Sequence, residues 1–150
     1  MGQITEELER YKKIAFDTNL FIYLMEKHPK YFDVAKSIFD MVEKGQLYAT
    51  TSILVITELL TKPMKDGNKN LIQKYKAVIS TFPNLGIRNF DYEISIVTAK
   101  IRAKYNFKTP DAIFIATAIE EKSEVFITND KKLKNIEEID VIIIDDYITE

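Results

Sequence analysis

The stretch Thr109-Pro-Asp-Ala-Ile-Phe-Ile-Ala-Thr-Ala-Ile119, followed by Val125-Phe-Ile-Thr-Asn-Asp130, decides the fold of this chain. Thr109 predicts the N-cap of a helix, and the proline after it predicts the first helical position, where a missing N–H costs nothing. The run after Asp111 is apolar on all sides, which is typical of a buried helix. The second stretch is β-branched and aromatic and predicts a buried strand that ends at Asp130. One carboxylate therefore opens a buried helix, and another closes the strand that follows it.

Composition indicates one globular domain and excludes several kinds of chemistry. The chain has 150 residues, 46% of them hydrophobic and 29% charged. Its net charge of −2 gives no global positive field, so contact with nucleic acid must come from a local patch. The absence of cysteine excludes disulfides, thiolate metal sites and a cysteine nucleophile, and the single His28 leaves little room for histidine catalysis.

The chain also lacks the sequence features of a membrane or secreted protein. No apolar run approaches the roughly 20 residues that a membrane span needs. The acidic N-terminus is unlike a signal peptide. We therefore expect a cytoplasmic protein that makes no contact with membranes.

Short apolar strands alternate with helices along the rest of the chain. We expect strands at 14–16, 47–51, 87–90, 125–128 and 141–144, and helices at 18–25, 31–44, 53–61, 70–81, 91–105 and from 109, with a loop at 62–69 and a helical turn at 131–136. Strands that are apolar throughout belong to parallel sheets covered on both faces. The pattern predicts a three-layer α/β/α fold with a central, mainly parallel five-stranded sheet. Residues 1–12 form an extension with helical spacing, and 13–150 form the domain.

Acidic side chains are the candidate functional groups, because ligands of such folds bind beyond the carboxyl ends of the strands. Asp17 and Asp130 each follow a predicted strand, and Asp111 opens a buried helix. For each of these three, the alternative to a functional role is an ordinary structural one, as a helix cap or as a charge that complements a helix dipole. Glu58 has apolar neighbours on its helix, and a buried charge without a partner is costly. We expect Glu58 to point into a cleft. We interpret Asp145 and Asp146, which also follow a predicted strand, as a solvated chain end.

A cleft with several carboxylates is suited to a divalent cation. Unaided, the carboxylates would repel one another and some would stay protonated. An oxygen-only ligand set without His or Cys suits Mg²⁺ or Mn²⁺. Such an ion activates a water and neutralises charge at a phosphorus; where two ions bind, about 3.5–4 Å apart, one serves attack and the other the leaving oxygen. The chemistry that this pattern favours is phosphodiester hydrolysis.

Four segments of the chain, in the expected order, resemble the PIN domain and within it the VapC-like toxin ribonucleases. They are Phe16-Asp-Thr-Asn-Leu-Phe-Ile-Tyr23, Ser52-Ile-Leu-Val-Ile-Thr-Glu-Leu59, Thr109-Pro-Asp-Ala-Ile-Phe-Ile-Ala-Thr-Ala118 and Phe126-Ile-Thr-Asn-Asp-Lys131. The resemblance covers about residues 13–147. The first dozen residues exceed the start that is usual in these toxins.

The resemblance implies a metal-dependent endoribonuclease that uses Mg²⁺ or Mn²⁺. It implies an acidic quartet and two supporting polar residues, which in this chain are Asp17, Glu58, Asp111 and Asp130, supported by Asn19 and Thr128. We assign Asp17 and Asp111 as principal metal ligands and Glu58 as a ligand or as the base for water. Asp130 would bind through water or complete a second metal site. The resemblance further implies an RNA substrate, a cognate antitoxin and a homodimer.

Basic residues near the predicted mouth are candidates to bind substrate phosphates, although a solvated helix face is an alternative for each. They are Arg102, Lys104, Lys108, Lys131 and Lys132.

Three other functions fit the sequence less well. A haloacid-dehalogenase-type phosphatase needs an aspartate where Asn19 stands, and a phosphorelay receiver needs paired N-terminal acids that are missing here. The alternative of another class is a PIN-like module that binds RNA or a protein partner without catalysis. The intact quartet argues against it, because a lost activity usually leaves at least one acid replaced.

Overall fold

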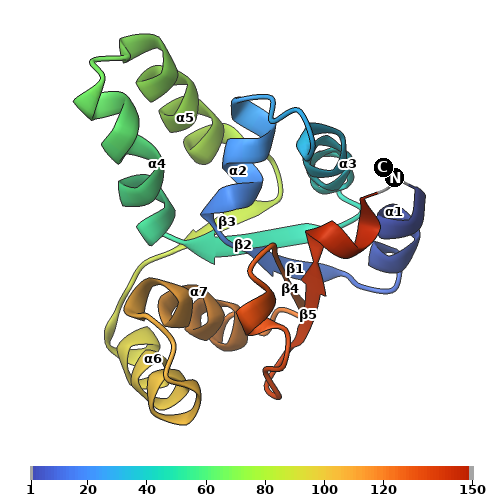
Figure 1. The fold of residues 1–150 in the computed structure, drawn as a ribbon, viewed down its shortest axis with the longest axis vertical. Helices are drawn as coiled ribbons and strands as arrows, with labels where there is room; N and C mark the ends of the chain where they lie inside the picture. Colours follow the sequence, from blue (N-terminus) through green and yellow to red (C-terminus); the bar gives the residue numbers. More distant parts are fainter. Residues whose placement is uncertain (1, 149–150) are drawn as a thin grey trace.

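Figure 1 shows the computed structural model of the chain, which describes residues 2–148. Residue 1 of the predicted extension and residues 149–150 of the predicted domain lie outside this range. The helices are α1 (Gly2–Leu8), α2 (Thr18–Met25), α3 (Phe32–Glu43), α4 (Leu54–Lys65), α5 (Lys69–Thr81), α6 (Tyr92–Tyr105) and α7 (Thr109–Glu120). The strands are β1 (Lys13–Phe16), β2 (Tyr48–Ser52), β3 (Leu85–Arg88), β4 (Val125–Thr128) and β5 (Asp140–Ile143). Two 3-10 helices, η1 (Lys131–Leu133) and η2 (Ile144–Tyr147), follow β4 and β5.

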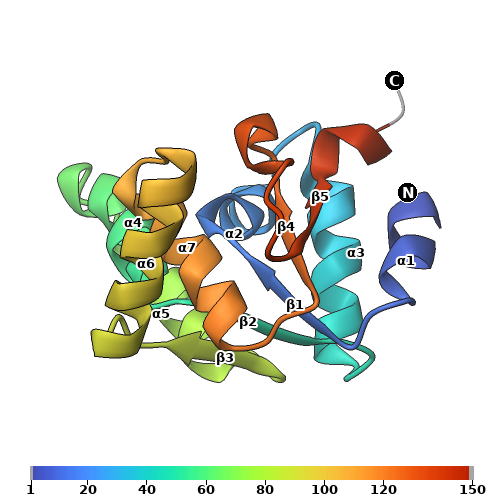
Figure 2. The ribbon, with the colours of Figure 1, turned by 90° about the horizontal axis from the view of Figure 1, so that it is seen from below.

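The five strands form one sheet in the order β3-β2-β1-β4-β5, and all four pairings are parallel. Helices α2 and α3 cover one face, and α7 covers the other with α6 packed outside it (Figures 1 and 2). This arrangement confirms the predicted three-layer α/β/α fold. Successive strands are added outward on one side from β1 to β3, and β4 then returns to the other side of β1. The strand order therefore reverses beside β1, where such folds place their ligands.

The buried parts of the fold follow the apolar pattern of the sequence. All residues of α7 from Ala112 to Ala118 are buried, as predicted for a helix that is apolar on all sides. On the opposite face, the rings of Phe16, Phe21 and Phe39 contact one another, with centroids 5.4–5.5 Å apart. The carboxyl end of β1 is thus held between two packed layers. Within residues 2–148, none of the helices is both long and apolar enough to cross a membrane.

The start of α7 and the end of α4 differ from the prediction. Lys108 is the N-cap of α7, and Thr109 lies inside the first turn instead of capping it. The predicted loop at 62–69 is wrong in its first half, because α4 continues to Lys65 through Pro63. A proline normally interrupts a helix. Here Pro63 is buried, lies in the last turn and gives up only one helical hydrogen bond there, so packing outweighs the loss.

The last three corrections concern short segments. The third strand is Leu85–Arg88, two residues earlier than predicted; Gly86 hides it in the sequence because glycine is a weak strand residue. A Cβ at Gly86 would lie 2.7 Å from the hydroxyl of Tyr48, so the exposed side chain of Tyr48 would have to shift to admit one. The last strand ends at Ile143, one residue early, and the helical turn after β4 stops at Leu133. Boundaries of short elements are set by pairing partners that the local sequence does not contain.

Candidate active site

Asp17 stands at the carboxyl end of β1, where two hydrogen bonds fix its side chain. As the N-cap of α2, it accepts a hydrogen bond on Oδ1 from the backbone N–H of Asn19 at 3.3 Å. Thr128 ends the neighbouring strand β4, and its hydroxyl donates to Oδ2 of Asp17 at 2.6 Å. The same hydroxyl accepts from the backbone N–H of Asp130 at 3.1 Å. The ordinary capping role and the candidate functional role therefore coexist in Asp17, and the parallel pairing of β1 and β4 brings Thr128 to it.

Glu58 reaches the same region from α4. Its Oε1 accepts a hydrogen bond from the hydroxyl of Thr18 at 2.5 Å. Glu58 is exposed and lines a cavity, as expected for a side chain that points into a cleft. The apolar neighbours Val55 and Leu59 point to the interior on other sides of α4, which leaves position 58 on its open face. Thr18 was not singled out from the sequence; its place directly after Asp17 was the only signal.

Asp111 is the third residue of α7 and is partly buried. Burial raises the pKa of its carboxyl, and the charge of Asp130 raises it further. Lys132 and Lys108 act in the opposite direction. An acid in the first turn also complements the helix dipole, as the ordinary alternative for Asp111 supposed.

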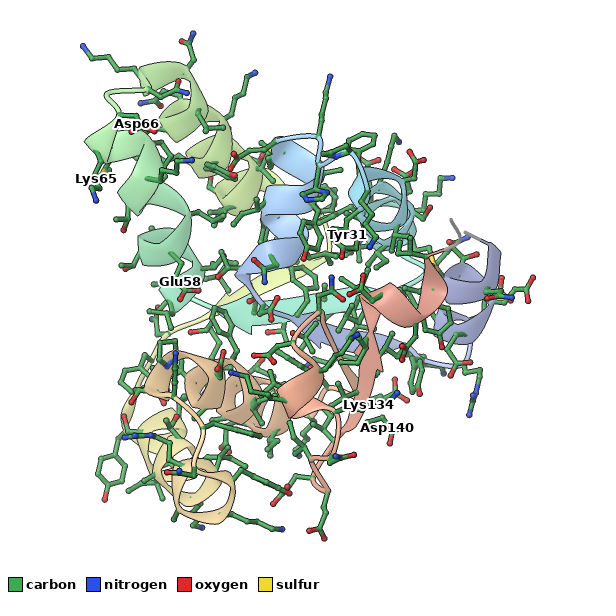
Figure 3. The ribbon with its side chains drawn as sticks, viewed as in Figure 1. Tyr31, Glu58, Lys65, Asp66, Lys134 and Asp140 are labelled. Carbon is green, nitrogen blue, oxygen red and sulfur yellow. The ribbon has the colours of Figure 1, made fainter. Side chains whose placement is uncertain are left out.

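These three acids line a single cavity of about 280 Å³. Its remaining walls come from the starts of α2 and α7, namely Thr18, Asn19, Ile22, Pro110 and Phe114. Glu58 occupies the part of α4 nearest the sheet (Figure 3). Residues from three separate regions of the chain thus meet beyond the carboxyl end of β1.

Asp130 and Thr128 contact the site from behind rather than from within the cavity. Asp130 caps η1 by accepting on Oδ1 from the backbone N–H of Lys132 at 3.0 Å, which is the ordinary role considered for it. Its charge still acts on Asp111. Thr128 is fully buried under Asp17. Asn19 is exposed and lines the cavity.

Burial raises the pKa of Asp17 to about 6. The hydrogen bonds from Thr128 and Asn19 lower this pKa, whereas the charges of Asp111 and Glu58 raise it. The charges of the other two acids in the cavity therefore oppose ionisation of Asp17. At neutral pH, the protein holds negative charge there against an unfavourable environment, which a bound cation would relieve.

The donor atoms of the cavity suit a hard divalent cation. Every charged donor is a carboxylate oxygen, which Mg²⁺ and Mn²⁺ prefer. Among residues 2–148, no three acidic or histidine side chains converge closely enough to enclose a metal by themselves. Mg²⁺ is commonly bound through one or two carboxylates, with waters and substrate phosphates completing its shell. The residues present fit that open mode of binding.

The candidate phosphate-binding residues divide into two groups. Lys104 pairs with Glu138 at 3.1 Å and Glu137 at 3.5 Å, and Nε of Arg102 donates to the carbonyl of Phe107 at 3.1 Å. These two cations are already engaged. Lys108, Lys131 and Lys132 are exposed, and among residues 2–148 none of them is in an ion pair.

A hydrogen-bond network that the sequence did not predict supports the end of β4. Asn129 donates to the hydroxyl of Tyr23 at 3.3 Å and accepts from the backbone N–H of Asp145 at 2.9 Å. The carboxylate of Asp145 accepts from the hydroxyl of Tyr31 at 2.6 Å. Asp145 is therefore a fixed structural residue, and its interpretation as a solvated chain end was wrong. These partners are far apart in sequence, so no local pattern could reveal them.

Comparison with known proteins agrees with this geometry. Residues 14–139 match the family described as the PIN domain. No curated protein matches the chain.

Several solved structures from toxin–antitoxin systems share the fold. A toxin–antitoxin complex from Klebsiella pneumoniae is 24% identical, with a TM-score of 0.66 over 87% of this chain and 97% of that one. VapBC2 from Rickettsia felis, bound to a DNA fragment from its promoter, is 21% identical, with a TM-score of 0.70 over 87% and 97%. VapC20 from Mycobacterium tuberculosis, a toxin that cleaves the sarcin–ricin loop, is 13% identical, with a TM-score of 0.65 over 85% and 98%. At these identities the likeness establishes the fold.

Proposed function

Because this chain belongs to the PIN domain family, we propose that it is a metal-dependent endoribonuclease that hydrolyses RNA phosphodiester bonds. The observation that carries the proposal is the meeting of Asp17, Glu58 and Asp111 in one cavity at the point where the strand order reverses. The charges of Asp111 and Glu58 that act on Asp17, together with the all-oxygen chemistry of the three acids, support a divalent cation there.

In the proposed site, Asp17 and Asp111 are the residues that hold Mg²⁺ or Mn²⁺. When bound, such an ion supplies an activated water and neutralises charge at the phosphorus. Thr128 and the N–H of Asn19 fix both oxygens of Asp17, which orients its remaining lone pairs toward the cavity. Asp130 acts on Asp111 through its charge and would bind through water or complete a second metal site.

Glu58 is the candidate base, or an additional ligand. Thr18 donates to Oε1 and so restricts the carboxylate to one orientation. The second oxygen, Oε2, is then the one available to accept a proton from water. Because Glu58 is exposed, it can exchange that proton with solvent after each turnover.

We also propose a cognate antitoxin as a protein partner, a toxin role and a homodimer. The support for the partner is that the similar structures from Klebsiella pneumoniae and Rickettsia felis come from toxin–antitoxin systems. RNA as the substrate is supported by VapC20, a toxin that cleaves the sarcin–ricin loop.

The proposal is tested by following Mn²⁺ binding with electron paramagnetic resonance. The wild-type chain should bind Mn²⁺ saturably, and the Asp17→Asn, Asp111→Asn double variant should lose that binding. A matched control removes two exposed acids from α3, through Asp33→Asn and Glu43→Gln, and should bind as the wild type does.

RNA cleavage is then measured for the same three proteins in Mg²⁺ and in Mn²⁺. Cleavage should require the metal and disappear in the cavity variant alone. If wild type and cavity variant bind Mn²⁺ equally, even with a short RNA present, the nuclease proposal fails. The chain would then be a PIN-like module that binds RNA or protein without catalysis.

A further inference from the structure

Positive charge is concentrated on one part of this acidic chain, the hairpin formed by α4 and α5. Beyond Glu58, the rest of the hairpin with the residue that follows it, residues 59–82, contains one acid, Asp66, and five lysines, which are Lys62, Lys65, Lys69, Lys74 and Lys76. This segment has a net charge of +4 in a chain whose total is −2, so the remainder carries −6. All five lysines are exposed. Helices α4 and α5 lie side by side and extend away from the sheet (Figure 1).

Two of these lysines lie in line with the acidic cavity. Lys62 and Lys65 follow Glu58 on α4 by four and seven residues, a spacing that places all three on one side of the helix. From the helical rise, the two lysines lie about 6 and 10 Å along the axis from Glu58. Figure 3 shows Glu58 at the end of α4 nearest the sheet and Lys65 at the far end. The side of α4 that enters the cavity with an acid therefore continues outward with cations.

The lysines of the hairpin are not used inside the protein. Among residues 2–148, no ion pair includes any of the five. Glu58 and Lys62 have the four-residue spacing that usually forms a pair on a helix. Here Thr18 binds the carboxylate of Glu58 instead. The ammonium group of Lys62 is thus free to contact another molecule.

An ordinary solvated surface explains this distribution poorly. Such surfaces intersperse charges of both signs. Lys62 and Lys65 do complement the dipole at the end of α4, but Lys69, Lys74 and Lys76 lie elsewhere, on α5. A run of one sign beside an acidic cavity is instead suited to a polyanion that must cross that cavity.

We propose that Lys62 and Lys65 bind phosphates of the RNA substrate and guide the strand into the cavity, an inference that rests on the proposed ribonuclease function. Lys108 and Lys132, whose charges act on Asp111, provide the cationic flank on the α7 side. The strand then runs from the α4–α5 hairpin, across Asp17 and Asp111, to that second flank. These contacts position the strand without reading its sequence.

A protein helix is the competing occupant of the hairpin. A groove of about 300 Å³ lies on α4, lined by Ile56, Thr57, Leu60, Thr61 and Met64. The charge distribution favours RNA, because the lysines extend directly from the acid that lines the cavity. If RNA occupies the hairpin, RNA affinity should depend on Lys62 and Lys65. If a protein helix occupies it, RNA affinity should not depend on them.

The test measures binding of a short, labelled single-stranded RNA of mixed sequence by fluorescence anisotropy at several salt concentrations, with EDTA present. The test variant is Lys62→Gln, Lys65→Gln, which keeps good helix formers at both positions. The control, Lys44→Gln, Lys100→Gln, removes two exposed lysines, one directly after α3 and one in α6, that form no ion pair within residues 2–148. Two lost phosphate contacts should weaken binding roughly tenfold at low salt and reduce the slope of log affinity against log salt by about 1.4. The control should retain the wild-type slope.

Each other outcome has a definite meaning. If the test variant keeps the wild-type affinity and slope, or if the control loses as much, the inference is overturned and the hairpin is better regarded as a protein-docking surface. A wild-type chain that binds no RNA at low salt overturns it as well. If RNA binding depends on Lys62 and Lys65 but the chain fails the Mn²⁺ and cleavage tests, the hairpin inference stands and the nuclease proposal fails.

Once an RNA that the chain cleaves is known, KM and kcat of the same variants distinguish a role in positioning the strand from a role in catalysis. Loss of Lys62 and Lys65 should raise KM and leave kcat and Mn²⁺ affinity unchanged. A fall in kcat at unchanged KM would contradict a role in binding the strand.

Discussion

At the scale of single residues, Asp17 combines a structural contact with an electrostatic cost. It caps α2 and accepts from Thr128, yet its pKa is raised to about 6 from an ordinary 3.8. Between about pH 4 and pH 6, the unfolded chain loses the proton of Asp17 while the folded chain keeps it. Stability therefore falls as the pH rises through this window, and the cost of up to about 3 kcal/mol is complete above it.

The first prediction follows for the metal-free protein. Asp17→Asn keeps a capping side chain but does not titrate, so it should escape this cost. The variant should gain stability over wild type by up to about 3 kcal/mol at neutral pH and by little near pH 4. Urea unfolding in EDTA at the two pH values measures the difference. A difference that does not change with pH would show that Asp17 is not held at a raised pKa.

The second prediction concerns the hydroxyl beneath Asp17. Thr128→Val removes a hydrogen bond to a charged oxygen, which is worth about 1.5–3 kcal/mol. The ionised form of Asp17 loses that support, so the pH midpoint of Mn²⁺ binding should move upward by roughly one to two units.

Thr117→Val is the matched control for this prediction, because Thr117 is equally buried but donates within α7 to the carbonyl of Ile113. It should leave the pH midpoint in place. Equal shifts in the two variants would mean that the Thr128 effect comes from packing and not from the contact with Asp17.

At the scale of elements, the hairpin that presents Lys62 and Lys65 is joined to α2 through Tyr75. The side chain of Tyr75 is fully buried in α5, and its hydroxyl donates to the carboxylate of Glu26, which follows the last turn of α2, at 2.5 Å. This contact, together with apolar packing, fixes the position of the hairpin beside the cavity.

The third prediction separates those two contributions. Tyr75→Phe loses only the hydroxyl and should cost about 1 kcal/mol of unfolding free energy, because Glu26 is exposed. Tyr75→Ala should cost about 3–5 kcal/mol, since it also empties a packed site. Chemical denaturation of both variants measures the costs. If Phe is as damaging as Ala, the hydrogen bond and not packing holds α5 in place.

At the scale of the whole molecule, the proposed metal should act as a ligand of the folded state. A cation that binds only the folded chain stabilises it by about 2.7 kcal/mol at a hundred times its Kd. The fourth prediction is that Mn²⁺ raises the Tm of the wild type and that EDTA reverses the rise. The Asp17→Asn, Asp111→Asn variant should show neither effect. An equal rise in both proteins would place the metal elsewhere on this acidic chain.

The fold was predictable to the level of class and strand number, since apolar runs and their spacing are local properties. The buried helix after Asp111 and the strand before Asp130 were predicted from such runs and are confirmed. The extent of α4 beyond Pro63 and the position of the strand around Gly86 were not, because each depends on a distant packing partner. Propensity yields to tertiary packing at such positions.

The sequence by itself determined the chemistry available to this protein: carboxylates without cysteine, one histidine, three acids at the ends or starts of predicted elements, and a fourth, Glu58, within a predicted helix. Only the tertiary structure decided how those acids divide. Asp17, Glu58 and Asp111 line one cavity, while Asp130 caps η1 and acts through its charge. It also decided that Lys104 is engaged with Glu137 and Glu138 and that, among residues 2–148, no ion pair includes a lysine of the hairpin. The reason is physical: residue type is fixed locally, whereas pairing, burial and pKa depend on neighbours that only the folded chain supplies.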